Sequence, residues 1–283
     1  MATNSVRALV DAEWLAGNLN SPHVAVVDGS WHLPTINRDP LAEFETTHIP
    51  GAVFFDIDRI ADDANPLPHM IPSDEKFAGQ VSALGIGNDD HIIAYDTTGV
   101  GSAARVWWMF HLFGHDRVSV LDGGLPIWQK SGGPVEDQVP VPTTTHFTAQ
   151  LNRDLLRTTE DLLRNVENGA EQVLDARTQG RFTGKEPEPR PGLRSGHIPK
   201  SLNLPFLDLY DPKTHLMKSV DQLTEVFSKS GVGEEKRVIT SCGSGITACN
   251  LALALHLIGR TDVAVYDGSW SEWGGRIDTP IGK

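Results

Sequence analysis

Short apolar runs alternate with longer apolar stretches along this chain. In its second half, runs rich in β-branched residues predict strands at 173–175, 238–241 and 263–266, and a longer apolar run predicts a helix at 246–258. Strands that alternate with helices indicate an α/β fold with a parallel sheet flanked by helices. The strands are almost entirely apolar, as expected for a sheet that is buried on both faces.

The same order of elements occurs twice, because the chain contains an internal repeat. Residues 91–128 align with residues 236–273 at a shift of 145 positions, and residues 26–31 and 48–52 resemble 173–178 and 197–201. The matched pairs include polar, glycine and tryptophan positions: His111 and His256, Gly114 and Gly259, Asp122 and Asp267, Trp128 and Trp273. The sequence therefore predicts two tandem domains of the same α/β fold.

A linker separates the two repeats. Residues 131–150, SGGPVEDQVPVPTTTHFTAQ, are rich in proline and threonine and follow neither the helical nor the strand period. We therefore expect a boundary near residue 140, with an N-terminal domain at 1–140 and a C-terminal domain at 150–283.

Composition and charge exclude several classes of protein. Of the 283 residues, 39% are hydrophobic and 22% charged. This composition is that of a globular protein with a full hydrophobic core and argues against a disordered chain. The net charge of -13 argues against a nucleic-acid partner, which would require a basic surface. No secretory signal or apolar run of about 18 residues is present, so we expect no membrane span. Two cysteines cannot form a disulfide framework, which favours a reducing, cytoplasmic location.

One of these cysteines lies in a glycine-rich turn, SCGSGITAC, at 241–249. Cys242 follows a predicted strand and precedes a predicted helix, where open α/β sheets bind ligands. Gly243 and Gly245 allow successive N–H groups to converge on the sulfur, and Ser244 and Thr247 add hydroxyl donors. Such a nest favours the nucleophilic thiolate. Cys249 lies within the apolar helical run and is interpreted as a core residue.

Several chemistries that use a cysteine fit this turn poorly. A phosphatase loop of the tyrosine-phosphatase type requires an arginine six positions after the cysteine, where this chain has Ala248. A cysteine protease could use one of several histidines as a base, but it does not require a cradle of neutral residues. A metal site needs more soft ligands than one cysteine and scattered histidines supply. A persulfide anion carried on Cys242 fits best, with no metal and no cofactor.

The turn, together with RFTGKEPEPRPGLRSGHIP at 181–199 and the duplication, resembles the 3-mercaptopyruvate sulfurtransferases of the rhodanese superfamily. The resemblance implies two rhodanese-like domains, a cysteine persulfide intermediate, and a catalytic cysteine in the C-terminal domain only. Thr97 occupies the position of Cys242 in the first repeat, so the N-terminal domain is expected to be catalytically inactive.

The resemblance also implies the sulfur donor and the residues that bind it. Thiosulfate sulfurtransferases carry basic residues in the loop after the cysteine, whereas Gly243 and Ser244 are neutral, which favours 3-mercaptopyruvate. Arg181 and Arg190 match the substrate-binding arginines of the family, and a guanidinium fork suits a carboxylate and a neighbouring carbonyl. The loop residues expected around the substrate are Gly243, Gly245, Ile246 and Thr247. Arg177 and Arg194 are interpreted as ion-pair residues.

Protonation of the pyruvate enolate requires a proton source near the sulfur. Asp58, His69 and Ser244 match the relay proposed for the family, with Asp58 orienting His69 and the serine passing the proton. His48 and His197 both lie in HIP motifs that recur in the two repeats, so they are interpreted as structural.

Two alternatives to this enzyme remain: a thiosulfate sulfurtransferase, and a persulfide carrier without its own donor chemistry. The arginine pair favours an enzyme, because a carrier has no carboxylate to recognise. The sulfur acceptor is expected to be a thiol, such as thioredoxin or a small thiol, or cyanide.

Overall fold

The computed structural model describes residues 6–283. It contains two compact units, each with its own five-stranded sheet. The first unit comprises the described residues up to Asp63, Ile71–Asn152 and Lys213–Met217; the second comprises Ala64–Met70, Arg153–Pro212 and Lys218–Lys283. Two short segments therefore belong to the unit opposite to the one expected from their place in the sequence.

Each sheet is parallel and has the same strand order. In the first unit the order is β1-β5-β4-β2-β3, and in the second it is β6-β10-β9-β7-β8. The predicted duplication and the predicted α/β class are thus confirmed. The strands of the first sheet are β1 (Leu9–Val10), β2 (Val24–Asp28), β3 (Val53–Phe54), β4 (His91–Tyr95) and β5 (Val118–Leu121); those of the second are β6 (Leu156–Arg157), β7 (Gln172–Asp175), β8 (Leu202–Asn203), β9 (Val238–Ser241) and β10 (Val263–Tyr266).

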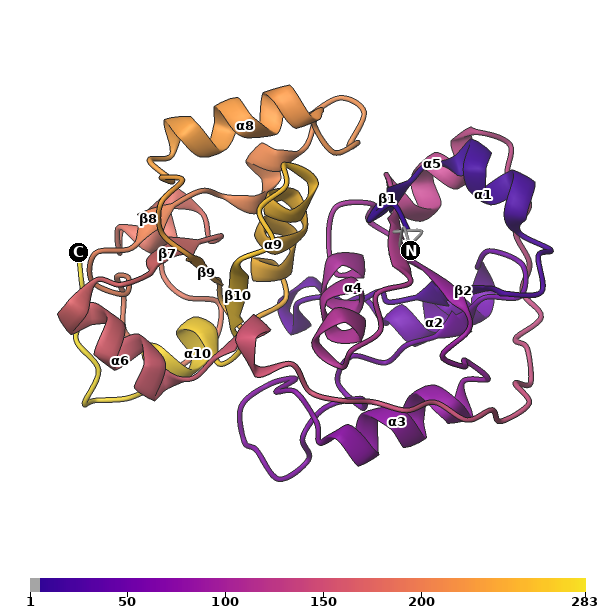
Figure 1. Cartoon of the computed structure of the whole chain (residues 1–283), viewed down its shortest axis with the longest axis horizontal. Coiled ribbons are helices and arrows are strands. Elements are labelled where there is room, and N and C mark those ends of the chain that lie inside the picture. Colours follow the sequence, from indigo (N-terminus) through magenta and orange to yellow (C-terminus); the bar gives the residue numbers. More distant parts are fainter. Residues whose placement is uncertain (1–5) are drawn as a thin grey trace. The chain divides into compact units, whose positions relative to one another are not determined.

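Helices flank both sheets (Figure 1). Those of the first unit are α1 (Ala12–Asn18), α2 (Pro40–Thr46), α3 (Asp74–Ala83), α4 (Ala103–Leu112) and α5 (Gly124–Lys130). Those of the second are α6 (Thr159–Asn168), α7 (Gln179–Phe182), α8 (Val220–Lys229), α9 (Ala248–Leu257) and α10 (Ser269–Trp273). Short 3-10 turns lie at Pro34–Ile36, Arg153–Leu155 and Phe206–Leu209.

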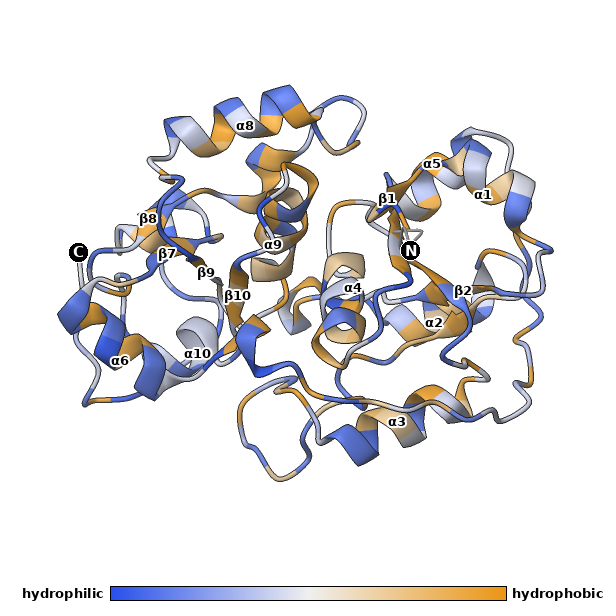
Figure 2. Ribbon diagram, viewed as in Figure 1, coloured by the Kyte–Doolittle hydropathy of each residue, from blue (hydrophilic) through white to orange (hydrophobic). Residues whose placement is uncertain are grey.

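Burial explains why α4 and α9 are mostly apolar, with few polar residues in either helix. α9 packs on β9 and β10 and is itself covered by α8, and most of its residues are buried. Figure 2 shows that most of this helix is hydrophobic. α8 and α6 instead present one apolar face to the protein and one polar face to solvent, and each begins with a capping box, at Ser219 and Thr158. The central strands β4 and β9 are buried along their whole length, as the sequence predicts.

Paired contacts in the two units show why certain residues recur in both repeats. Trp128 donates its indole N–H to the carbonyl of Pro134 at 2.7 Å, and Trp273 donates to that of Pro280 at 2.8 Å. His48 stacks on Phe44 and His197 on Phe182, and each Nδ1 hydrogen-bonds to the carbonyl of the residue on which it stacks. The structural interpretation of both histidines agrees with these contacts.

None of the helices in residues 6–283 is both long enough and apolar enough to span a membrane.

Candidate active site

The Cys242 loop connects β9 to α9 in the second unit. β9 ends at Ser241 and α9 begins at Ala248, two residues later than the predicted helix, because Ile246 and Thr247 complete the turn around the sulfur. Cys242 is only 2% exposed. The Gly245 N–H points at its Sγ at 3.2 Å, and Gly245 has a φ of 83°, a backbone conformation that favours glycine.

The N-terminal end of α10 fixes the backbone of this loop. The Cys242 N–H donates to Ser269 Oγ at 3.1 Å, and the Trp270 N–H donates to the Cys242 carbonyl at 3.0 Å. The Gly243 carbonyl accepts from both the N–H and the hydroxyl of Ser271, at 2.8 and 2.7 Å. These contacts hold the carbonyls of Cys242 and Gly243 from outside and so fix the turn in which the Gly245 N–H points at the sulfur.

The other predicted loop residues differ in how far they are buried. Ser244 and Ile246 are buried, whereas Gly243 and Thr247 are partly exposed. Cys249 is fully buried in α9 and donates its S–H to the Gly245 carbonyl at 3.2 Å. The interpretation of Cys249 as a core residue is confirmed.

Arg181 lies directly against the loop, in the short helix α7. A Cβ atom added at Gly243 would lie 2.9 Å from Arg181 Nη2, so the guanidinium occupies the space that a side chain at position 243 would need. Glu188 holds this guanidinium, accepting from Nη2 at 2.6 Å and from Nε at 3.2 Å. The structure therefore brings Arg181 and the Cys242 loop together.

Arg177 and Arg194 have different roles. Arg177 is buried, pairs with Asp175 and Glu188 at 2.6 and 2.7 Å, and lies over the Trp270 ring at 4.2 Å. Burial alone would lower its pKa, but the two carboxylates outweigh burial and raise that pKa above its usual range. Arg177 is thus an ion-pair residue as expected. The interpretation of Arg194 as an ion-pair residue is wrong. Its guanidinium donates to the backbone carbonyls of Trp273, Gly274 and Thr279 and so supports the C-terminal segment.

Arg190 and the relay residues remain predictions. Arg190 is partly buried and lies two residues after Glu188. Asp58 belongs to the first unit, where it accepts from the Trp31 indole N–H at 2.9 Å. His69 is 5% exposed with a φ of 42°, and its segment belongs to the second unit, not to the N-terminal half that contains it in sequence.

The corresponding loop of the first unit has no thiol and surrounds a carboxylate of its own. Asp96, next to Thr97, accepts hydrogen bonds from the backbone N–H groups of Thr98, Gly99 and Ala103 at 2.9, 2.7 and 3.0 Å. These three amides are therefore already engaged by a carboxylate of the protein itself. The arrangement supports the expectation that this unit is inactive.

A cysteine at position 97 should not restore activity to the first unit. In a Cys242→Ser background, Thr97→Cys is expected to give no persulfide and no sulfur transfer, because the Asp96 carboxylate occupies the amide cradle and repels an anionic sulfur. Mass spectrometry after donor treatment and a turnover assay test this. Sulfur loading on the introduced thiol in that double variant would contradict it.

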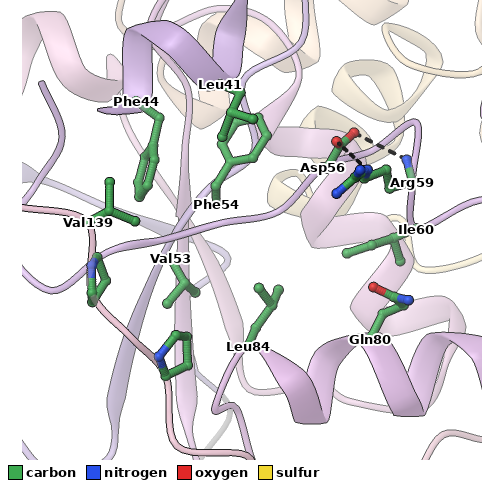
Figure 3. A pocket seen from close by; sticks show the side chains of 12 residues that line it. Leu41, Phe44, Val53, Phe54, Asp56, Arg59, Ile60, Gln80, Leu84 and Val139 are labelled. Atoms are coloured by element: carbon green, nitrogen blue, oxygen red, sulfur yellow. Dashed lines mark hydrogen bonds and ion pairs between the residues drawn. The ribbon is translucent and has the colours of Figure 1, made fainter. Parts of the chain in front are cut away.

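The cavity in Figure 3 lies in the first unit, has a volume of about 270 Å³ and is walled by α2, β3, α3 and linker residues 139–142. Its lining is apolar apart from Asp56, Arg59 and Gln80. It contains none of the predicted site residues and no nucleophile, so we assign it no part in the candidate site. Within residues 6–283, no group of three His, Cys, Asp or Glu side chains is arranged to hold a metal ion.

The sequence did not point to Glu188, Ser269 or Ser271. A comparison of the repeats offered a signal for the serines: at the positions of Ser269 and Ser271 the first repeat has Gly124 and Pro126, so only the second repeat can form these hydrogen bonds. Glu188 gave no such signal, because the first repeat matches only the HIP at the end of the 181–199 motif and not the part that contains Glu188.

The fold and this loop place the chain in a known family. The model of the rhodanese-like domain matches residues 11–131 and 158–276, and the chain belongs to that family. It is 45% identical to the human 3-mercaptopyruvate sulfurtransferase, over 94% of this chain and 92% of the human one. It is 42% identical to the Arabidopsis thaliana mitochondrial thiosulfate/3-mercaptopyruvate sulfurtransferase 1, over 96% and 77%. The crystal structure of the Escherichia coli 3-mercaptopyruvate sulfurtransferase SseA superposes with a TM-score of 0.86 at 37% identity, covering 94% of this chain and 99% of that one.

Proposed function

We propose that this protein is a sulfurtransferase that takes sulfur from 3-mercaptopyruvate and passes it to a thiol acceptor through a persulfide on Cys242. The observation that carries the proposal is the juxtaposition of a buried cysteine, an N–H group 3.2 Å from its sulfur, and the Arg181 guanidinium against the same loop. A buried thiol and a guanidinium, a group suited to binding a carboxylate, thus lie against the same loop, which supports the proposal.

The chemistry assigns a role to each residue. The Cys242 thiolate attacks the donor sulfur, the carbon–sulfur bond breaks, and its electron pair remains on carbon as the enolate of pyruvate. Arg181 and Arg190 hold the carboxylate and carbonyl, and the relay of Asp58, His69 and Ser244 supplies the proton that converts the enolate to pyruvate. The persulfide then yields its outer sulfur to an acceptor thiol or to cyanide, which restores Cys242.

The loop amides contribute at the persulfide stage. Terminal sulfur on Cys242 carries the negative charge, and N–H donors in a buried site stabilise an anion without reorganisation. A thiol acceptor such as thioredoxin would require a reducing environment, and we infer a cytoplasmic location; the Arabidopsis relative is named as mitochondrial.

Thiosulfate is the second candidate donor, because the name of the Arabidopsis relative joins both substrates. Steady-state rates with the two donors side by side test the choice. The neutral loop predicts a kcat/KM for 3-mercaptopyruvate well above that for thiosulfate; a preference for thiosulfate in the unmodified protein would overturn the assignment.

A basic loop is expected to reverse this preference. In the double variant Gly243→Arg, Ser244→Lys, the new cations favour a compact dianion, while the side chain at 243 displaces Arg181 from its position over the loop. We expect kcat/KM to fall for 3-mercaptopyruvate by about tenfold or more and to rise for thiosulfate. Ser244→Lys alone is the matched control, because it adds charge but leaves the space for Arg181. An unchanged donor ratio in the double variant would contradict the role of loop charge.

A further inference from the structure

Glu188 is a buried carboxylate shared by two arginines next to the cysteine loop. Its side chain is 1% exposed; Oε1 accepts from Arg177 Nη1 at 2.7 Å, and Oε2 accepts from Arg181 Nη2 and Nε at 2.6 and 3.2 Å. It lies between Pro187 and Pro189, which restrict its backbone. A carboxylate this buried is retained only where it is fully paired.

This pairing fixes one edge of the Arg181 guanidinium and leaves the other edge available. Within residues 6–283, the Arg181 side chain hydrogen-bonds to Glu188 alone, through Nε and Nη2. Nη1 is therefore available for a ligand, and the plane of the fork is set by Glu188. Since Nη2 also lies against Gly243, a small rotation of the guanidinium would change its distance from the sulfur site.

Glu188 is in turn anchored to the body of the unit. Arg177, its second partner, donates to both oxygens of Asp175 and to the Gly196 carbonyl at 2.9 Å, and it lies on the ring of Trp270. The backbone N–H of Trp270 also donates a hydrogen bond to the Cys242 carbonyl. The ion pairs of Arg181, Glu188, Arg177 and Asp175 thus form one network, which reaches the end of β7 at Asp175. Through Trp270 the same network also contacts the loop that contains Cys242.

The charges within this ion-pair network cancel. Asp175 and Glu188 carry two negative charges, and Arg177 and Arg181 carry two positive ones. Arg181 therefore presents directional N–H donors with little surplus positive charge. Such a group suits the single carboxylate of 3-mercaptopyruvate better than the two charges of thiosulfate, which would gain more from an unbalanced cation.

We infer that Glu188 is a positioning residue that sets both the orientation and the effective charge of Arg181, and so contributes to the choice of a keto-acid donor over a compact dianion. The inference rests on the proposed function, in which Arg181 binds the donor carboxylate. Glu188 acts through Arg181 and contacts no reacting atom.

Two substitutions separate orientation from charge. Glu188→Gln keeps the shape but removes the charge; we expect single-turnover loading by 3-mercaptopyruvate to slow by about tenfold, mostly as weaker binding, and kcat/KM for thiosulfate to be unchanged or higher. Glu188→Asp keeps the charge but is too short to reach both arginines; loading by 3-mercaptopyruvate should slow without a gain for thiosulfate. Release of sulfur from a pre-formed persulfide to a small thiol should stay near the original rate in both.

A double-mutant cycle tests whether the effect passes through Arg181. In an Arg181→Ala background, Glu188→Gln should cause no further loss of loading by 3-mercaptopyruvate. Additive losses, or equal slowing of loading and of release, would overturn the inference and assign Glu188 a general structural role. If Glu188→Gln does not fold, Glu188→Asp in the same cycle gives the same test.

The failure of this inference can be told apart from failure of the proposed function. If Arg181→Ala slows loading but neither Glu188 variant does, only the role of Glu188 is wrong. If Arg181→Ala leaves loading unchanged, the binding role of Arg181 is wrong and the inference on Glu188 falls with it.

Discussion

Replacing Cys242 with serine is expected to abolish sulfur transfer, whereas replacing Cys249 with serine leaves most of it. A serine hydroxyl cannot carry a persulfide, and at neutral pH it remains protonated and weakly nucleophilic. In Cys249→Ser the new hydroxyl can still donate a hydrogen bond to the Gly245 carbonyl, as the Cys249 thiol does, so the turn around the nucleophile should persist. Steady-state sulfur transfer to a small thiol or to cyanide measures both.

The same pair of variants contains its own control for folding. Both cysteines are buried within one loop-and-helix unit, so a general disturbance would affect both proteins to a similar degree. Near-complete loss in Cys249→Ser together with substantial residual activity in Cys242→Ser would reverse the assignment of the nucleophile.

Removal of Arg181 or Arg190 should damage the donor half of the reaction alone. Each alanine variant loses charge-assisted hydrogen bonds to the donor, each worth on the order of 1.5 to 3 kcal/mol, which corresponds to roughly a ten- to hundredfold fall in kcat/KM for 3-mercaptopyruvate. The acceptor meets a persulfide from which pyruvate has already departed. Stopped-flow loading should therefore slow, while sulfur release from a pre-formed persulfide stays near the original rate.

Lysine at either position should restore only part of the loss. A lysine at 181 can pair with Glu188, but as a point charge it cannot at once hold Glu188 and present a second, fixed edge to the donor. Arg164→Ala is the matched control, because Arg164 is an exposed arginine of α6 in the same unit. Equal damage to loading and to release in the Arg181 and Arg190 variants would point to a general electrostatic role.

The fold could be predicted from the sequence because its signals are local and occur twice. The strands at 238–241 and 263–266 are observed at the predicted residues. A short run of β-branched residues between two turns favours a strand over a helix, which needs a longer segment. The helix after Cys242 begins later than the apolar pattern indicates, because apolarity at Ile246 reflects burial in the loop, not helical structure.

The site was only partly accessible from the sequence, because its supporting contacts join distant segments. The glycines beside Cys242 reveal the turn, but nothing local shows that Ser271 closes it from 28 positions away or that Glu188 links two arginines. Nor does sequence position show that the segment with His69 belongs to the second unit. Long-range pairings of this kind are set by topology and packing.

The most direct test of the central claim is to locate the transferred sulfur. The protein is treated with 3-mercaptopyruvate in the absence of acceptor, digested with trypsin and analysed by mass spectrometry together with pyruvate release. Cys242 and Cys249 fall in one tryptic peptide, residues 238–260, so fragment ions must distinguish them. We expect one added sulfur on Cys242, none on Cys249, and one pyruvate per sulfur bound; pyruvate release with Cys242 unmodified would contradict the persulfide mechanism.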